Sequence, residues 1–224
     1  MMDISALLGV ERGVTALIGG GGKTTLMYTM AEELRRRGTV LVTTSTHIQR
    51  PEQYPTLLTA DAAAVAAALA THGVVCVAGE TAEGKLCAPA LSFELLAALA
   101  DFVLVEADGS KRLPQKAHAP HEPVIPPNAR RTVYVVGVGG FGHPIREVCH
   151  RPERYAALCG AAEDDIVTPT LEAAVLHAEG HDTGWIYINK VETSEDWRNA
   201  ETLAALLPGK VIAGSLWKKQ YRKL

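Results

Sequence analysis

The chain alternates short, continuous apolar runs with longer stretches whose apolar positions repeat at helical spacing. Apolar runs without polar alternation are typical of parallel strands that are covered on both faces. The predicted strands are Val14–Ile18, Val40–Thr44, Val74–Ala78, Phe102–Glu106, Thr132–Val136, Trp185–Asn189 and Lys210–Ala213. The predicted helices are Thr24–Arg37, Ala62–Ala70, Phe93–Ala100, Thr170–Glu179 and Asp196–Leu207. This alternation predicts an α/β fold with a doubly wound, mostly parallel sheet of about seven strands.

One long segment interrupts the alternation, between about residues 111 and 128. Its five prolines exclude a regular helix or a central strand, and they are Pro114, Pro120, Pro123, Pro126 and Pro127. Long ordered loops are uncommon and often functional. We therefore expect a single domain over residues 1–224 with a proline-rich loop inserted after the strand Phe102–Glu106, although a plain surface excursion is the alternative.

Composition and charge narrow the class of protein. Of the 224 residues, 47% are hydrophobic and 21% are charged, and the net charge is -3. This balance gives no reason to expect a nucleic-acid or anionic-membrane partner. No apolar run reaches the ~18 residues of a membrane span, and the first residues lack the basic segment of a signal peptide. We expect a cytoplasmic protein.

A glycine-rich loop carries the strongest functional signal. Gly19, Gly20, Gly21 and Gly22 follow the first apolar run, and Lys23, Thr24 and Thr25 lead into a helical pattern. Strand, glycine loop, Lys-Thr and helix are the context of a phosphate-binding P-loop, in which backbone N–H groups and the lysine hold phosphates. The usual first glycine is replaced by Leu17, and the variant resembles P-loops of the signal-recognition and MinD class.

Two carboxylates at the end of the strand Phe102–Glu106 are candidates for a magnesium site. Glu106 and Asp108 are two residues apart, so in extended backbone they share a face. With the Thr24 hydroxyl, Asp108 is the favoured Mg²⁺ ligand, while Glu106 could position water. His47, just after the second strand, is a candidate proton carrier.

The sequence Asn189-Lys190-Val191-Glu192 ends the sixth predicted strand. GTP-binding proteins place Asn-Lys-x-Asp at this point, and there the carboxylate reads guanine. Glu192 could make the same pairing, and Ser215 ends the next strand, where a loop contacting the base is expected. Guanine and adenine both remain open, with guanine favoured.

The proline-rich loop carries cations and histidines that could contact a second substrate or a partner protein. These candidates are Lys111, Arg112, Lys116, His118, His121 and Glu122. Prolines limit the freedom of an unbound loop, which lowers the ordering cost of binding.

Taken together, these residues resemble the selenium-dependent hydroxylase accessory proteins of the YqeC type. The resemblance rests on Gly20–Thr25, Leu41–Thr46, Val105–Ser110, Lys116–Pro126, His150-Arg151 with Glu153, and Asn189–Val191. Members of that family look like P-loop NTPases encoded beside selenium-dependent molybdenum hydroxylases. The resemblance implies a role in the maturation of those enzymes or of their molybdenum cofactor.

The function expected is therefore a Mg²⁺-dependent protein that binds and hydrolyses GTP or ATP and assists such a hydroxylase. Two alternatives stay open: a kinase for a small anionic metabolite, with His47, Lys111 and Lys116 around the acceptor, and a nucleotide-gated docking module that hydrolyses little.

Overall fold

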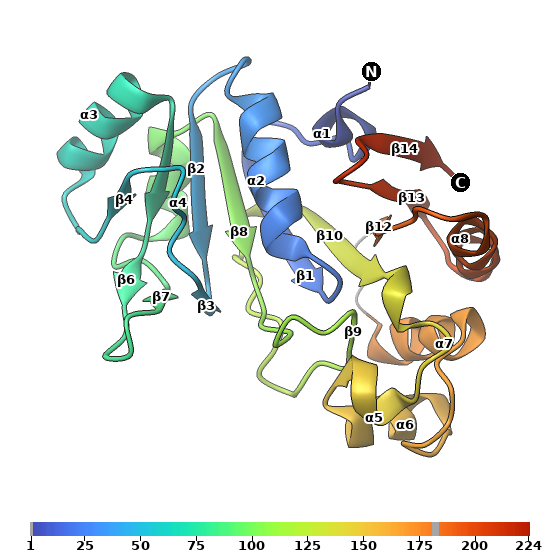
Figure 1. Cartoon of the computed structure of the whole chain (residues 1–224). Coiled ribbons are helices and arrows are strands. Elements are labelled where there is room, and N and C mark those ends of the chain that lie inside the picture. Colours follow the sequence, from blue (N-terminus) through green and yellow to red (C-terminus); the bar gives the residue numbers. More distant parts are fainter. Residues whose placement is uncertain (1, 181–183) are drawn as a thin grey trace. The chain divides into compact units, whose positions relative to one another are not determined.

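A computed structural model describes residues 2–180 and 184–224 of the chain (Figure 1). The chain forms two compact units, each built from three segments. Unit 1 contains Met1–Ile18, Thr24–Gly109 and Pro123–Thr132, and unit 2 contains Gly19–Lys23, Ser110–Glu122 and Val133–Leu224. Each unit is described by itself below. The single domain predicted from the sequence stays a prediction.

Unit 1 is built on parallel strands in the order β1-β8-β2-β5-β4. These strands are β1 (Gly13–Gly19), β8 (Phe102–Glu106), β2 (Val40–Thr44), β5 (Val74–Val77) and β4 (Thr56–Leu57). Glu106 pairs in register with Leu17 of β1 and with Thr44 of β2. The register thus places Glu106 at the carboxyl end of β8, beside the carboxyl end of β2, and ligands of open α/β sheets bind at that edge.

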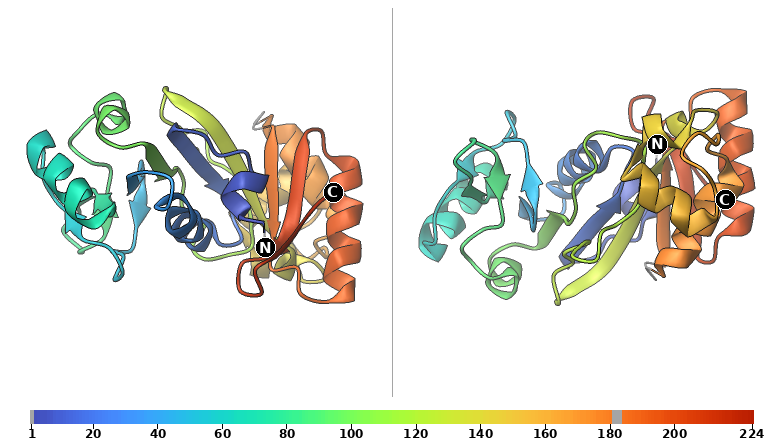
Figure 2. Two further views of the ribbon diagram at one scale, coloured as in Figure 1. Left: turned by 90° about the horizontal axis from the view of Figure 1, so that it is seen from above. Right: turned by 90° about the horizontal axis from the view of Figure 1, so that it is seen from below.

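Helices cover both faces of these strands. On one face, α3 (Ala62–His72) and α4 (Phe93–Leu99) pack against strand residues such as Leu41 and Val103. Helix α2 (Lys23–Leu34) lies on the other face (Figure 2). Unit 1 also contains α1 (Ile4–Leu7) and the small antiparallel sheet of β3 (His47–Ile48), β7 (Leu86–Cys87) and β6 (Gly79–Glu80).

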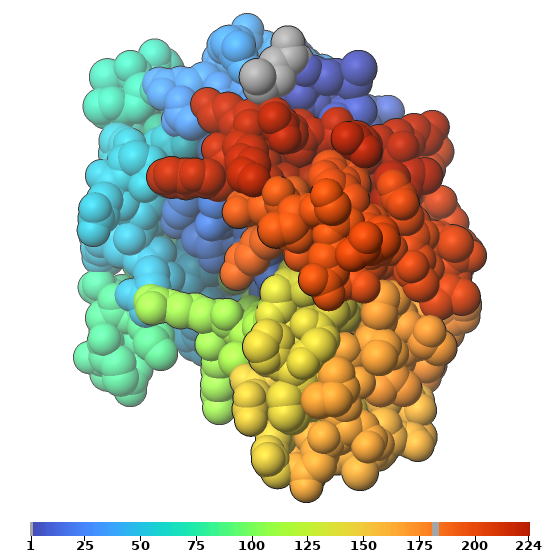
Figure 3. Space-filling view, turned by 45° about the vertical axis from the view of Figure 1, so that its right-hand side comes forward, coloured from blue at the N-terminus to red at the C-terminus, as the bar shows by residue number. Residues whose placement is uncertain are grey.

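Unit 2 has the strand order β14-β13-β12-β10. Strands β10 (Ala129–Gly137), β12 (Trp185–Asn189) and β13 (Lys210–Ser215) are parallel, and β14 (Gln220–Lys223) closes an antiparallel hairpin. Its helices are α5 (Ile145–Val148), α6 (Pro152–Cys159), α7 (Pro169–Glu179) and α8 (Ser194–Leu206). The C-terminal segments, orange to red, form a continuous surface in Figure 3.

The α/β fold with a mostly parallel sheet and flanking helices is confirmed. All seven predicted strands are present, with ends that differ by a few residues. Short elements were not predicted, because two-residue strands carry no readable periodicity. They include β9 (Gln115–Lys116), β11 (Cys149–His150), the turn η1 (Val138–Gly140) and hairpin strand β14. Across the described ranges, no helix is long and apolar enough to cross a membrane.

A carboxyl group is buried in the helical part of unit 2. Glu172 of α7 is 1% exposed and accepts a hydrogen bond of 2.6 Å from the hydroxyl of Tyr155 in α6. Burial raises the pKa of Glu172 to about 8, although the hydrogen bond from Tyr155 opposes this shift. At neutral pH the group is therefore mostly protonated.

The raised pKa of Glu172 predicts a pH-dependent stability. Between about pH 5 and pH 8 the folded chain keeps a proton that the unfolded chain releases, so the free energy of unfolding falls as pH rises. Glu172→Gln should remove this slope, up to about 1.4 kcal/mol per pH unit. Urea unfolding across this range, with exposed Glu153→Gln as control, measures it. Parallel profiles for the native chain and Glu172→Gln would contradict the assignment.

Candidate nucleotide-binding site

The glycine loop joins β1 to α2 in the arrangement predicted from the sequence. Its first residue, Gly19, has φ of 95°, and a Cβ there would lie 2.4 Å from the carbonyl oxygen of Val135 in β10. Gly20 donates its N–H to the same carbonyl at 2.9 Å. Only glycine allows this left-handed backbone and this approach to β10.

Two side chains close the loop from within unit 2. Lys23 is 2% exposed, and its Nζ donates to the carbonyl oxygen of Gly19 at 2.6 Å. Asn189, at the end of β12, donates from Nδ2 to the carbonyl oxygen of Gly21 at 2.8 Å. The hydroxyl of Tyr187 donates to Asn189 Oδ1 and so fixes the orientation of its amide. The lysine ammonium and the asparagine amide therefore both donate to carbonyl groups of the loop.

The proline-rich loop is bonded directly to the glycine loop. The N–H of Gly21 donates to the carbonyl oxygen of Leu113 at 3.2 Å, and the N–H of Gly137 donates to that of Pro114 at 3.2 Å. A Cβ on Gly20 would lie 2.5 Å from the Pro114 oxygen. An amide of the glycine loop thus donates to a backbone carbonyl of the proline-rich loop in this structure.

In unit 1, a hydroxyl and a carboxylate meet at the start of α2. The hydroxyl of Thr24 donates to Glu106 Oε2 at 2.6 Å. Asp108 is fully buried two residues further on, and Thr25 is exposed. Thr24 and Glu106 offer the oxygen ligands that Mg²⁺ prefers. The sequence favoured Asp108 as the ligand, whereas the Thr24 hydroxyl donates to Glu106; the metal assignment itself stays a prediction.

The last residue of β2 also contacts Glu106, at the backbone carbonyl of Glu106. Thr44 Oγ1 donates to the carbonyl oxygen of Glu106 at 2.8 Å. His47 lies exposed on β3, where it pairs in register with Cys87 of β7. The structure shows no contact between His47 and these groups within the part of the chain it describes, and its role as a proton carrier stays a prediction.

The residues predicted to read a base come together in unit 2. Ser215 at the end of β13 donates its hydroxyl to Glu192 Oε1 at 2.7 Å. Lys218 donates its backbone N–H to Ser215 Oγ and its ammonium to the Glu192 carbonyl. Lys190 is exposed with φ of 65°. This network holds the Glu192 carboxylate beside the turn of the β13–β14 hairpin.

Buried polar side chains hold the proline-rich loop together and attach it to other segments of unit 2. Lys116 Nζ lies 2.7 Å from Glu122 Oε2, which also accepts from Arg151 at 2.9 Å. His118 Nδ1 lies 2.7 Å from Glu179 Oε2 in α7. Burial alone would raise the pKa of Glu122, but the hydrogen bonds from Arg151 and Lys116 outweigh it and lower that pKa.

Other basic residues of the proline-rich loop are exposed, in contrast to the buried Lys116 and His118. Lys111 and Arg112 are exposed, with φ of 49° and 65°, and His121 is exposed further along. His118 and Glu122 contact Glu179 and Arg151, which the motif analysis did not assign to this loop. Local sequence patterns do not reveal such partners, because His118 and Glu179 are 61 residues apart.

The close approach of the two loops predicts a difference between two glycines of unit 2. Gly20→Ala should lower the free energy of unfolding by about 1–3 kcal/mol, because its Cβ would meet backbone atoms that cannot swing away. Gly139→Ala is the matched control, since nothing lies within 4 Å of its Cβ position. Urea unfolding measures both. Equal stability of the two variants would contradict the packing.

Comparisons with known proteins agree with the motifs. The model of the YqeC protein family matches residues 15–153, which include the glycine loop and the proline-rich loop. The chain is 33% identical over 196 residues to the "Uncharacterized protein YqeC" of Escherichia coli (strain K12), covering 80% of this chain and 76% of that protein.

Among solved structures, a signal recognition particle 54 kDa protein from Aeropyrum pernix K1, in complex with GDP, aligns with a TM-score of 0.40 and 14% identity. The alignment covers 96% of this chain and 44% of that chain, so this chain spans less than half of that protein. The family match and the identity to the Escherichia coli protein place the chain in the YqeC protein family.

Proposed function

We propose that this protein binds a nucleoside triphosphate with Mg²⁺ and hydrolyses it. The observation that carries the proposal is the glycine loop between β1 and α2, with a buried lysine held on a loop carbonyl. Buried lysines are rare unless they are paired. A lysine that donates to a carbonyl of its own glycine loop is suited to move to a phosphate, which is the stronger partner.

The phosphate contacts would come from the backbone. The N–H groups of Gly20, Gly21 and Gly22, together with the start of α2, supply donors and the positive end of the helix. A phosphate that takes the N–H of Gly21 has to displace the carbonyl of Leu113. Binding the phosphate would therefore release one attachment of the proline-rich loop.

The metal would be held in unit 1. The Thr24 hydroxyl and the Glu106 carboxylate are already 2.6 Å apart, and Asp108 follows β8 closely. Mg²⁺ keeps several waters when it binds with phosphate oxygens, so one or two protein oxygens suffice. We propose Thr24 as a direct ligand and the two carboxylates as acceptors for the metal-bound waters.

For the base we propose guanine. Ser215 donates to one oxygen of Glu192, so the carboxylate is fixed in place before a ligand arrives. A carboxylate accepts from the two adjacent donors of guanine, N1–H and the exocyclic amine, whereas adenine presents no such pair. Asn189 links the glycine loop to the strand that ends at this point.

We further propose that the exposed cations Lys111, Arg112 and His121 contact a partner, while Lys116, His118 and Glu122 shape the loop. The bond between Gly21 and Leu113 favours nucleotide-gated docking over a purely catalytic role. The resemblance to accessory proteins suggests the partner: a selenium-dependent molybdenum hydroxylase or its cofactor, in the cytoplasm.

The phosphate role of Lys23 gives the first test. Lys23→Ala should weaken binding of GTP and Mg²⁺ at least about 100-fold, because a charge-assisted contact with the phosphates is lost. Isothermal titration measures the affinity, and Lys85→Ala, at an exposed turn, is the control. Release of free phosphate is measured on the same samples. Full triphosphate affinity in a folded Lys23→Ala protein would refute the proposal.

The base preference gives a second test. Glu192→Ala should reduce the affinity for GTP about 10–100-fold and leave that for ATP unchanged, since only guanine loses a charged partner. Competition titration of GTP against ATP measures the ratio, and exposed Glu201→Ala on α8 is the control. A native protein that prefers ATP would exclude guanine recognition while leaving the phosphate site intact.

A further inference from the structure

A tight turn lies immediately before the point where the proline-rich loop contacts the glycine loop. The N–H of Leu113 donates to the carbonyl oxygen of Ser110 at 2.9 Å, and the two central residues, Lys111 and Arg112, have φ of 49° and 65°. A hydrogen bond across four residues with positive φ at both central positions is the arrangement of a type I′ turn. Within the part of the chain that the structure describes, no other two adjacent non-glycine residues have positive φ.

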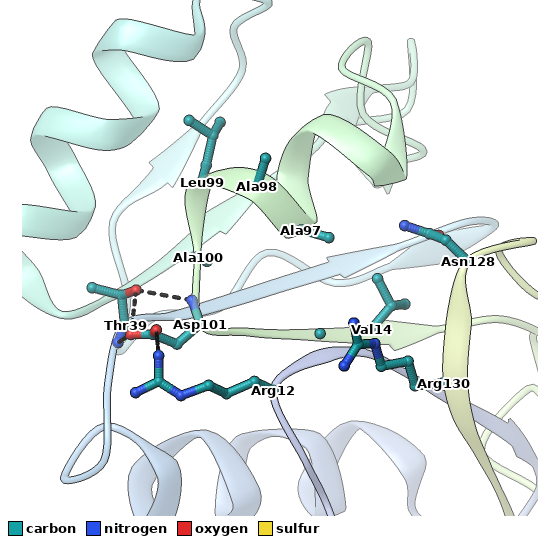
Figure 4. A pocket seen from close by; sticks show the side chains of 11 residues that line it. Arg12, Val14, Thr39, Ala97, Ala98, Leu99, Ala100, Asp101, Asn128 and Arg130 are labelled. Carbon is teal, nitrogen blue, oxygen red and sulfur yellow. Dashed lines mark hydrogen bonds and ion pairs between the residues drawn. The ribbon is translucent and has the colours of Figure 1, made fainter.

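This backbone conformation is unfavourable for residues other than glycine. The Cβ of an L residue crowds the backbone when φ is positive, so type I′ turns favour Asn-Gly or Gly-Gly. Glycine takes such a conformation elsewhere in the chain: Gly13, one of the residues that line the cavity shown in Figure 4, has φ of 108° under the stem of Arg130. Lys111 and Arg112 are exposed, and neither has a hydrogen bond or ion pair among the described residues that would compensate for its backbone strain.

The strained turn is bonded to the glycine loop through its own last residue. Leu113 closes the turn with its N–H, and its carbonyl oxygen accepts from the N–H of Gly21 at 3.2 Å. This distance is at the long end of the range for N–H···O bonds. Because the two bonds belong to one residue, a change in the backbone of the turn that moves Leu113 also changes the hydrogen bond to Gly21.

We propose that the Ser110–Leu113 turn is a latch, strained while it closes the glycine loop and relaxed when a phosphate opens it. The proposal rests on the proposed nucleotide site and adds how binding there is regulated. In the closed state Leu113 occupies the N–H of Gly21, and the two cationic residues keep positive φ. When a phosphate oxygen takes that N–H, the Leu113 carbonyl leaves and the turn relaxes, so the release of strain offsets part of the cost of opening.

Glycine and alanine variants at the two central positions test the latch, because alanine removes the same charges but keeps the strain. Lys111→Gly combined with Arg112→Gly should slow hydrogen exchange of the Gly21 amide about 10-fold relative to Lys111→Ala combined with Arg112→Ala, since the closed state is no longer strained. NMR of the ligand-free protein measures this exchange, and urea unfolding confirms that each variant is folded.

The matched control relieves the same kind of strain at another turn of unit 2. Lys219 is exposed between β13 and β14 with φ of 52°. Lys219→Gly should leave the exchange of the Gly21 amide as in the native chain, because that turn has no bond to Gly21. Equal slowing in Lys219→Gly and in the double glycine variant would overturn the latch, since Gly21 would then exchange through unfolding of the whole chain.

Nucleotide titration of the same variants separates the latch from the nucleotide site itself. With GTP or ATP and Mg²⁺, the double glycine variant should have a Kd about 10-fold higher than the double alanine variant. Unchanged or faster Gly21 exchange in the double glycine variant would overturn the latch whether or not the protein binds nucleotide. Slowed exchange with equal nucleotide affinity would overturn its regulatory role and leave the nucleotide site intact. Slowed exchange in a protein whose native form binds neither nucleotide would refute the nucleotide site, and with it the regulation.

Discussion

The arrangement of unit 2 depends on how closely backbone can approach backbone at the glycine loop. Carbonyls of Val135 and Pro114 lie where side chains would begin on Gly19 and Gly20. The missing Cβ atoms let β10 and the proline-rich loop pack directly against the loop's peptide groups. Amide and carbonyl groups there are consequently bonded to other protein groups, and a phosphate at the proposed site would compete for at least one of them.

The buried charges behind the proline-rich loop have a related effect. Lys116 and His118 are almost fully buried, and each faces a carboxylate within unit 2. The desolvation of such buried pairs offsets much of their electrostatic attraction, so their net contribution to stability is small. Their geometric effect is larger, because the contacts of His118 with Glu179 and of Glu122 with Arg151 hold the loop against other segments of unit 2.

The sequence predicts most of the fold and part of the candidate site. Continuous apolar runs locate the parallel strands, and Gly-Lys-Thr after a strand locates the loop, because both signals are local. Glu192 and Ser215 lie in contact, because Ser215 ends β13 and Glu192 follows the end of the neighbouring β12; their role toward a base stays a prediction. How the proline-rich loop is attached could not be predicted, because His118 contacts Glu179 of α7, 61 residues away, and Glu122 accepts from Arg151, 29 residues away. The choice between Glu106 and Asp108 as the neighbour of Thr24 likewise depends on side-chain direction.

The hydrogen bond from Asn189 to Gly21 makes the end of β12 part of the glycine loop's support. Glu192 is three residues further along the chain and is itself held by Ser215. A rearrangement of the glycine loop around phosphates would therefore be transmitted through one amide side chain to the carboxylate proposed to read the base. Recognition of the two ends of a nucleotide would then be cooperative, so that a free base or inorganic phosphate alone would be bound far less well than their separate contacts suggest.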